Sequence, residues 1–199
     1  QREINKKSGV IAVGAREFLI AYNVNLNTRD KKKATDIALD IREKGRAKRD
    51  QKGKIMRDSD NKIIKIPGKL KNVKAVGWYI NEYKQAQVSL NLTNYKTTPV
   101  HKAFEEVRKQ ANRRGLRVTG SEIIGLLPKE AILSSGKYYL KKQNSSAAIP
   151  EKDIIETAVH SLGLNDTSVF KNEKSIVEEA LFENKGLIEK NLIDFLDET

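Results

Sequence analysis

The sequence has 199 residues, a net charge of +12 and no cysteine. This length suits one domain, or one domain followed by a helical tail. The lack of cysteine excludes a disulfide scaffold, a thiol nucleophile and a cysteine-ligated metal site, and it is compatible with a reducing cytoplasm. No apolar run approaches the roughly 20 residues that a membrane-spanning helix needs, and no signal peptide opens the sequence. Because the first residue is Gln1 and not methionine, we expect a fragment or a processed product.

The charge is unevenly distributed, with +19 in residues 1–150 and −7 in residues 151–199. A strongly basic surface attracts nucleic acids, anionic lipids or polyanionic small molecules, although a merely solvated surface explains the same charge equally well. Nucleic-acid-binding modules usually add aromatic side chains for base stacking. Aromatic residues make up only 6% of this sequence, and none of the common nucleic-acid-binding motifs occurs in it.

Residues 9–26 contain two β-rich runs on either side of a turn at residues 14–17, a pattern that predicts a β-hairpin. In the second run, large apolar side chains alternate and share one face: Phe18, Ile20, Tyr22, Val24 and Leu26. The opposite face carries Asn23 and Asn25, which project the same way because side chains alternate along a strand. These two amides either face solvent or line a binding site, and the pattern favours neither alternative.

A helix is predicted over residues 31–44, because apolar residues recur there at helical spacing: Ala34, Ile37, Ala38 and Ile41. Gly45 is a suitable stop. Residues 45–71 are polar and rich in Lys and Arg. Residues 58–61 have the composition of a turn, and the flanks Lys54–Arg57 and Lys62–Ile66 could pair as a small hairpin. Long loops in compact domains are often functional, so we expect a loop or lid that contacts a substrate.

Residues 72–83 and 86–94 predict an antiparallel hairpin. Alternation in its second strand gathers three polar side chains on one face: Gln87, Ser89 and Asn91. A helix over residues 100–114 follows Pro99, which suits a first helical turn, and Gly115 ends it. The remaining predicted elements are a strand over 116–126 and helices over 128–135, 151–162, 173–183 and 187–196.

This order of elements predicts an α+β two-layer sandwich: a ferredoxin-like βαββαβ unit with a mixed or antiparallel sheet, helices on one face, and further C-terminal helices. We assign residues 1–150 to the domain core, residues 151–184 to a helical extension of the same domain, and residues 185–199 to a linker or the start of a following domain. We find no internal repeat in the sequence.

Candidate catalytic residues are few. The two histidines, His101 and His160, fall on different predicted helices, which is weak evidence for a metal site. His101 could act as a general base, but a histidine in this setting more often lies on a helix surface. The sequence has no Gly-rich phosphate loop and no nucleophile elbow. The polar strand faces remain as a candidate, since amide groups donate and accept hydrogen bonds together and can line a ligand groove; a solvated sheet face is the commoner arrangement.

Four long strings carry a family resemblance. They are GVIAVGAREFLIAYNVNL (9–26), IALDIREKGR (37–46), LKNVKAVGWYINEYKQAQVSLNLTNYKTTPVHKAFEEV (70–107) and VTGSEIIGLLPKEAIL (118–133). In this order and spacing they closely resemble the C-terminal subdomain of glutamate formimidoyltransferase, over about residues 1–180. Residues 187–199 resemble the opening of the cyclodeaminase half that fused members of the family carry.

The resemblance implies a cytoplasmic transferase of one-carbon metabolism. Such an enzyme moves a formimidoyl group between N-formimidoyl-L-glutamate and tetrahydrofolate in histidine degradation, uses no metal, and forms homodimers. Two α/β subdomains clasp the folate, and the catalytic histidine belongs to a His-Pro motif of the N-terminal subdomain. This sequence has no His-Pro pair, so we expect no catalytic residue here and no activity without the missing N-terminal subdomain.

The resemblance also puts forward folate contacts. Ser8 and Gly9 match the end of a folate-contacting stretch, and Asp40 matches a second contact position. From strand geometry we add four amide side chains: Asn23, Asn25, Gln87 and Asn91. Lys and Arg side chains within residues 42–57 could hold the carboxylates of a polyglutamate tail. Two alternatives stay open: a folate-binding or regulatory module without catalysis, and a basic nucleic-acid-binding domain.

Overall fold

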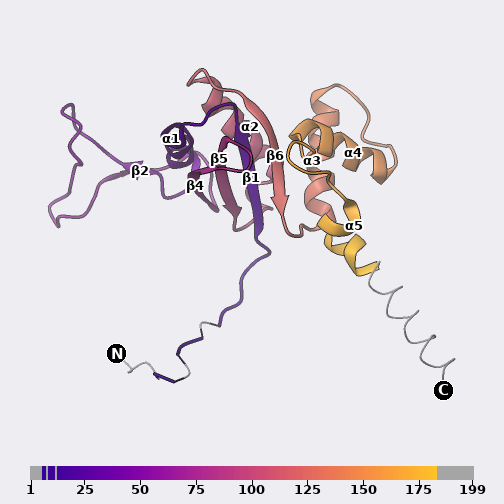
Figure 1. The fold of residues 1–199 in the computed structure, drawn as a ribbon, viewed down its shortest axis with the longest axis horizontal. Helices are drawn as coiled ribbons and strands as arrows, with labels where there is room; N and C mark the ends of the chain where they lie inside the picture. Colours follow the sequence, from indigo (N-terminus) through magenta and orange to yellow (C-terminus); the bar gives the residue numbers. More distant parts are fainter. Residues whose placement is uncertain (1–5, 8, 12, 183–199) are drawn as a thin grey trace.

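The computed structural model describes residues 6–7, 9–11 and 13–182 (Figure 1). Four strands form an antiparallel sheet in the spatial order β4 (Val73–Ile80), β5 (Gln85–Leu92), β1 (Ile20–Leu26) and β6 (Val118–Ile124). Helix α1 (Lys31–Ile41) lies between β1 and β4 in the chain, and α2 (Val100–Asn112) lies between β5 and β6. The chain order strand, helix, strand, strand, helix, strand confirms the predicted ferredoxin-like α+β sandwich.

The main core lies between the sheet and these two helices. Alternation along β1 turns four apolar side chains toward the helices, and all four have no exposed surface: Ile20, Tyr22, Val24 and Leu26. The predicted apolar stripe of α1 meets them with four buried residues: Ala34, Ile37, Ala38 and Ile41. Asp30 caps this helix by accepting a hydrogen bond from the backbone N–H of Lys32 at 2.8 Å.

The predicted hairpin within residues 9–26 is wrong. Only its second run forms a strand, β1, and the described residues between Gly9 and Leu19 belong to no named strand. The reason is topological, because β5 and β6 occupy both edges of β1 and leave no edge for residues 9–13 to pair with. Phe18, which the alternation placed in the core, is 42% exposed.

Two further helices, α3 (Lys129–Lys142) and α4 (Glu151–Leu162), pack against each other beside β6 (Figure 1). The structure confirms the predicted helix over 151–162, which Gly163 ends in a left-handed conformation. The predicted helix over 173–183 is interrupted: α5 covers Asn172–Ser175, Ile176 bridges to Leu127, and residues 177–182 are helical again. The predicted helix over 187–196 lies outside the described residues. Within the part of the chain that the structure describes, no helix has the length and apolar character to span a bilayer.

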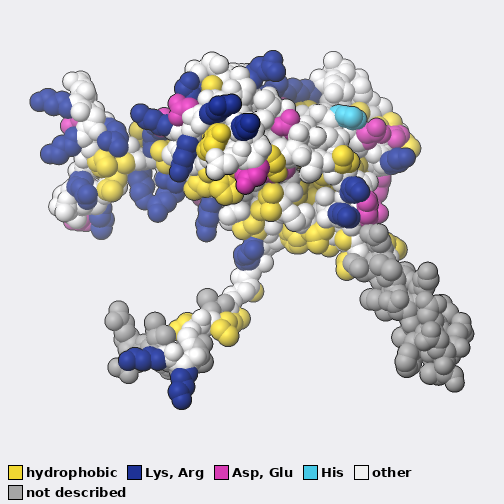
Figure 2. Space-filling view, in the orientation of Figure 1, with side chains coloured by type: hydrophobic (Ala, Val, Ile, Leu, Met, Phe, Trp, Pro, Cys, Tyr) yellow, Lys and Arg dark blue, Asp and Glu magenta, His cyan; other side chains and the backbone are white. Residues whose placement is uncertain are grey.

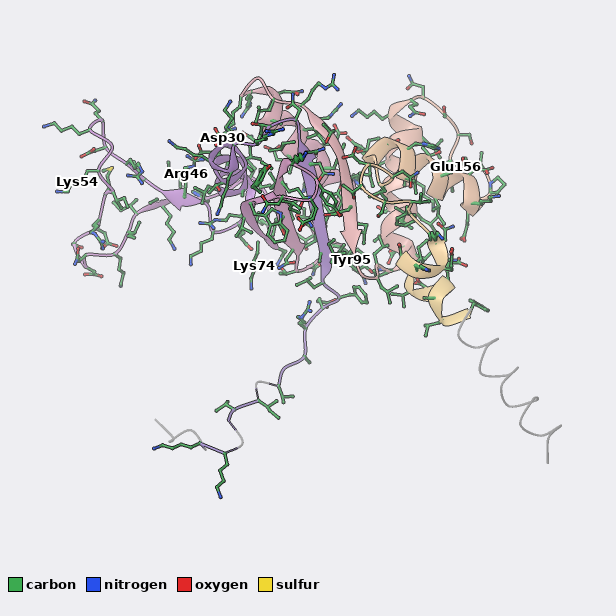
Figure 3. The ribbon with its side chains drawn as sticks, viewed as in Figure 1. Asp30, Arg46, Lys54, Lys74, Tyr95 and Glu156 are labelled. Carbon is green, nitrogen blue, oxygen red and sulfur yellow. The ribbon has the colours of Figure 1, made fainter. Side chains whose placement is uncertain are left out.

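Residues 46–66 form an arm that projects from the body beside α1, with Arg46 at its base and Lys54 in its outer part (Figures 1 and 3). Strands β2 (Arg46–Ala47) and β3 (Lys65–Ile66) pair at its base. Three residues spaced eight apart close a ring of backbone hydrogen bonds: Lys48 N to Ile64 O (2.8 Å), Met56 N to Lys48 O (2.9 Å) and Ile64 N to Met56 O (3.0 Å). The predicted pairing of the two flanks forms, since Arg57 and Ile63 make an antiparallel bridge, and the segment around Lys48 joins it as a third bonded segment.

The arm contains an internal repeat that the sequence reading missed. The segments 49–55 (RDQKGKI) and 57–63 (RDSDNKI) make the same turn. In each turn the aspartate, Asp50 or Asp58, accepts two backbone N–H bonds through Oδ1, and the preceding arginine donates to a carbonyl across the turn. Since no residue from 48 to 67 is fully buried, these polar bonds, and not an apolar core, hold the arm in shape.

Replacing both Asp50 and Asp58 by alanine should open the arm without unfolding the domain. Each carboxylate makes two backbone bonds on the protein surface, and a cap of this kind is worth about 1 kcal/mol. We expect the turn amides, including those of Lys54 and Lys62, to exchange with deuterium roughly fivefold faster or more, while the melting temperature stays within about 1 °C. Asp60→Ala is the control, because the Asp60 side chain contacts only Lys62 Nζ at 3.4 Å; equal exchange in both variants would contradict this account of the arm.

Candidate functional site

The face of the sheet that points away from α1 and α2, here called the open face, carries the polar side chains singled out in the sequence. Cross-strand pairing sets Val76, Ser89, Asn23 and Glu122 in one row across the four strands, and Trp78, Gln87, Asn25 and Gly120 in the next. Apolar side chains flank this polar centre and stay partly exposed: Val76 (55%), Trp78 (41%) and Ile124 (51%). The open face therefore has a polar middle with an apolar margin.

Hydrogen bonds join the polar side chains into one network. Gln87 Oε1 accepts from Trp78 Nε1 at 2.9 Å, and Gln87 Nε2 donates to Asn25 Oδ1 at 2.5 Å and to Glu122 Oε1 at 3.0 Å. Asn23 Nδ2 donates to the same Glu122 oxygen at 3.0 Å. Asn25 and Gln87 have no exposed surface and Asn23 has almost none. Because every buried amide is bonded, the network fixes the rotamers of its members.

The loop after α4 closes one end of the network. Asp166 Oδ2 accepts from Asn25 Nδ2 at 2.7 Å, and Thr167 Oγ1 donates to Glu122 Oε2 at 3.1 Å. This approach requires a glycine at position 120, since a Cβ atom there would lie 2.2 Å from the Asp166 Cβ. The segment after α4 thus contributes directly to the open face.

The structure brings together only part of the predicted folate site. Asn23, Asn25 and Gln87 lie in one network, and Asn91 lies on the same face, exposed, in the row of Lys74. Asp40 is on α1, which packs on the other face of the sheet. Its carboxylate pairs with Arg46 Nε at 2.7 Å and with Arg114 Nη2.

The two N-terminal contacts are not joined to this network. Gly9 lies in the segment before β1, which runs away from the sheet (Figure 1), and nothing lies within 4 Å of where its Cβ would be. Ser8 lies outside the described residues. The part of the predicted site that the structure brings together is therefore the open face.

Sequence reasoning missed four members of the network: Trp78, Glu122, Asp166 and Thr167. Glu122 pairs with Asn23 across β1 and β6, so strand alternation places it on the open face once the register of these two strands is known. The Asp166 and Thr167 contacts depend on how the α4 loop returns to the sheet, which no local pattern encodes.

Basic side chains gather elsewhere. Figure 2 shows Lys and Arg over the arm and the neighbouring part of the molecule, with Asp and Glu also gathered at the opposite, α4 end. A pocket of about 830 Å³ lies over the outer side of α2. Its lining includes five cations and two stacked rings: Lys69, Lys102, Arg108, Lys109, Arg113, His101 and Tyr138. Among the described residues, no group of three or more His, Asp or Glu side chains could hold a metal ion.

His101 should make the protein acid-sensitive below neutrality. Its ring stacks on Tyr138 at a centroid distance of 4.3 Å, and burial lowers its pKa from 6.5 to about 4, with Lys102 adding to the shift and Glu105 opposing it. The unfolded chain takes up the proton first, so stability falls as the pH drops from 6.5 toward 4. Because the ring is partly exposed, we expect a loss of only about 1–2 kcal/mol.

Urea unfolding at pH 7, 6, 5 and 4 measures this loss. His101→Phe keeps the stack and removes the titrating group, so its stability should fall less steeply over the same range. The exposed histidine of α4 provides the control, His160→Phe. If the free energy of unfolding fell equally steeply with pH in His101→Phe and in the unmodified protein, the His101 ring would not be the acid-sensitive group.

Comparison with known proteins identifies the family. A family model described as "Formiminotransferase domain" matches residues 21–182. The formimidoyltransferase-cyclodeaminase of Dictyostelium discoideum is 44% identical over 170 residues, which make up 85% of this chain and 28% of that protein. The corresponding protein of Gallus gallus is 41% identical over 191 residues, or 94% of this chain and 32% of that protein. The glutamate formimidoyltransferase of Thermoplasma acidophilum is 38% identical over 135 residues, or 68% and 37%.

The chain spans about a third of the length of these relatives. The match nevertheless runs through every strand of the sheet, through α1 to α4, and through the loop that closes the network. A family model that covers most of the chain and relatives that share more than a third of its residues lead to one conclusion: the chain belongs to the formiminotransferase domain family.

Proposed function

We propose that this chain is the folate-binding C-terminal half of a glutamate formimidoyltransferase, a cytoplasmic transferase of histidine degradation. The enzyme would transfer a formimidoyl group between N-formimidoyl-L-glutamate and tetrahydrofolate, without a metal. The observation that carries this proposal is the open face, where a network of hydrogen-bonded amides and carboxylates lies on one side of a central sheet. Family membership supplies the reaction class, and the network supplies a place for a heterocyclic substrate.

The surroundings of the network support a covered ligand site. A solvated sheet face has little reason to bury and bond its amides, and a face that packs on protein is usually apolar throughout. The open face combines a bonded polar centre with a partly exposed apolar margin of Val76, Trp78 and Ile124. Ligand sites typically combine a few placed polar groups with apolar walls. We therefore propose that a second protein layer, the missing N-terminal subdomain, covers this face and encloses the folate.

In this arrangement each predicted contact has a role. Asn91, which is exposed, would contact the pterin directly, while the buried amides of Asn23, Asn25 and Gln87 would act indirectly by holding Glu122 and Asp166 in place. Asp40 would act indirectly, because its carboxylate holds the guanidinium groups of Arg46 and Arg114 beside the basic arm. Those cations would attract the glutamate tail. The segment of Ser8 and Gly9 would reach the folate only when the second layer is present.

The chemistry would be shared between the two halves. This chain would supply orientation and exclusion of water, which bring the two substrates to reactive distance. A histidine of the N-terminal subdomain would transfer the proton, so the chain alone would be inactive. We include homodimer formation and a following cyclodeaminase domain, beginning within residues 185–199, in the same proposal.

Calorimetric titration with 5-formyltetrahydrofolate, a stable folate, tests the proposal, with and without the N-terminal subdomain of a relative added in trans. We expect weak binding by the chain alone, tighter binding by the mixture, and formimidoyl transfer only in the mixture. Triglutamylated folate should bind more tightly than the monoglutamate at low salt, with the difference shrinking as salt screens the charges. Tight binding of random RNA at moderate salt together with no folate binding in either format would instead establish the nucleic-acid alternative.

A further inference from the structure

Glu122 is the carboxylate at the centre of the open face, and the chain's own side chains use only part of its capacity to accept hydrogen bonds. Oε1 accepts from Asn23 Nδ2 and Gln87 Nε2, both at 3.0 Å, while Oε2 accepts, among the described residues, only from Thr167 Oγ1 at 3.1 Å. An ionised carboxylate offers about four acceptor sites. One site on Oε2 is therefore unused, on a side chain that is only partly buried.

The orientation of the amides leaves the open face with acceptors to offer and few donors. The NH₂ groups of Asn23 and Gln87 point to Glu122, and that of Asn25 points to Asp166. The indole N–H of Trp78 is bonded to Gln87. A ligand that enters this network consequently meets carboxylate oxygens and must bring its own N–H groups.

The local charge points the same way. Residues 1–150 carry +19, yet Lys74 is the only cation on the described strands that faces this side, and it lies at the edge strand in the row of Asn91. Glu122 and Asp166 thus make the middle of the open face negative within a basic domain. A cationic or donor-rich group gains energy there, while an anion is repelled.

We propose that Glu122 binds a pair of N–H donors attached to one carbon, an amidine-type N–C–N edge, and thereby sets the orientation of a substrate on the open face. This inference rests on the proposed function. Two of the proposed substrates carry such an edge: the 2-amino-4-oxo ring of the folate, and the cationic formimidoyl group of formimidoylglutamate. The unused site of Glu122 Oε2 receives one N–H of either edge through a charge-assisted hydrogen bond, and the second N–H shares Oε1 with the amides of Asn23 and Gln87. Glu122 is a positioning residue in this scheme, and no bond to it forms or breaks.

Trp78 provides a direct readout, because it is the only tryptophan of the chain and its Nε1 lies 2.9 Å from Gln87 Oε1, one residue removed from Glu122. Its indole ¹H–¹⁵N resonance can be followed during titration of the full chain mixed with the N-terminal subdomain of a relative. The ligands are 5-formyltetrahydrofolate and formimidoylglutamate, each compared with a counterpart that lacks the donor pair. The counterparts are the 2-desamino-2-methyl folate and N-formylglutamate.

We expect Glu122→Gln to weaken binding of one donor-bearing ligand by about 10- to 100-fold and to remove its advantage over the counterpart. A loss confined to the folate assigns the contact to the pterin ring, and a loss confined to formimidoylglutamate assigns it to the formimidoyl group. Glu82→Gln, an exposed change in the turn between β4 and β5, is the control and should bind like the unmodified chain.

Glu122→Asp keeps a carboxylate and should bind more weakly while still preferring the donor-bearing ligand. If Glu122→Gln displaces the indole resonance before ligand is added, this second variant decides, and loss of its preference overturns the proposal. Unchanged affinity and preference in Glu122→Gln overturn it while leaving the proposed function intact. Absence of binding of both ligands to the unmodified mixture overturns the inference and the proposed function together.

Discussion

Gly77→Ala is expected to destabilise the domain by about 3 kcal/mol or more, because β4 and α1 touch through their backbones at this point. A Cβ atom on Gly77 would lie 2.1 Å from the Thr35 nitrogen and 2.4 Å from the Ala34 carbonyl carbon. Neither of these atoms can rotate away, so α1 would have to move off the sheet and loosen the core that it covers. The added methyl group therefore costs far more than its size suggests.

Urea or thermal unfolding, followed by circular dichroism, measures this effect. For a domain of this size, about 3 kcal/mol corresponds to a fall in melting temperature of roughly 6–12 °C. Gly14→Ala is the matched control, since nothing lies within 4 Å of the added Cβ atom there; its effect should stay within about 0.5 kcal/mol. A Gly77→Ala protein as stable as this control would show that α1 is not seated on β4 as described.

Gln87→Leu should cost both stability and ligand binding. The leucine matches glutamine in size but leaves three groups without their partner: Trp78 Nε1, Asn25 Oδ1 and one acceptor site of Glu122. Each unsatisfied buried polar group costs about 1–3 kcal/mol, and Asn25 has no access to solvent. We expect a loss of about 3 kcal/mol of stability and at least about a tenfold loss of folate affinity, because the network no longer holds its amides in place.

Denaturant unfolding and calorimetry with the added N-terminal subdomain test the two effects separately. Gln51→Leu makes the same chemical change on an exposed turn of the arm and should alter neither quantity appreciably. Retention of full folate affinity in a folded Gln87→Leu protein would remove the open face from the proposed site. Retention of full stability would mean that the amide network does not hold together as the distances indicate.

Periodicity in the sequence predicted most of the two-layer fold, since the side chains that build it repeat locally. The alternation around Tyr22 and the helical spacing around Ile37 correctly located the core faces of β1 and α1. The first hairpin failed because strand pairing depends on which edges remain free, and β1 is paired on both sides. That information resides in the tertiary structure and not in residues 9–26.

Small residues misled the reading of α3. The sequence predicts a helix that ends at residue 135, yet α3 continues to Lys142. Ser135 Oγ donates a hydrogen bond to the Ala131 carbonyl oxygen at 3.1 Å, so its hydroxyl is satisfied inside the helix. Gly136 allows α4 to approach closely, because a Cβ atom at this position would lie 2.1 Å from the Ile154 carbonyl oxygen. Composition alone cannot separate a helix–helix contact of this kind from a loop.

The candidate site was predicted only in part for a related reason. Strand alternation selected Asn23, Asn25 and Gln87 correctly as neighbours on one face. The carboxylates that bind them come from positions 99 and 141 residues away in the chain, at Glu122 and Asp166. Contacts at such separations require the register of β6 and the path of the α4 loop, which the sequence does not state locally.

The base of the arm has a consequence for engineering. The chain leaves and re-enters the body at Gly45 and Gly68, where backbone meets backbone: an added Cβ atom would lie 1.8 Å from the Ile66 oxygen at Gly45 and 1.9 Å from the Arg42 oxygen at Gly68. Because the backbone at Gly45 lies against the backbone at Gly68, a short linker between these two residues can replace the arm without displacing α1 or β4. We therefore expect that the arm can be deleted while the domain still folds. The same junction between Gly45 and Gly68 is a suitable insertion site for a foreign loop or a fluorescent label.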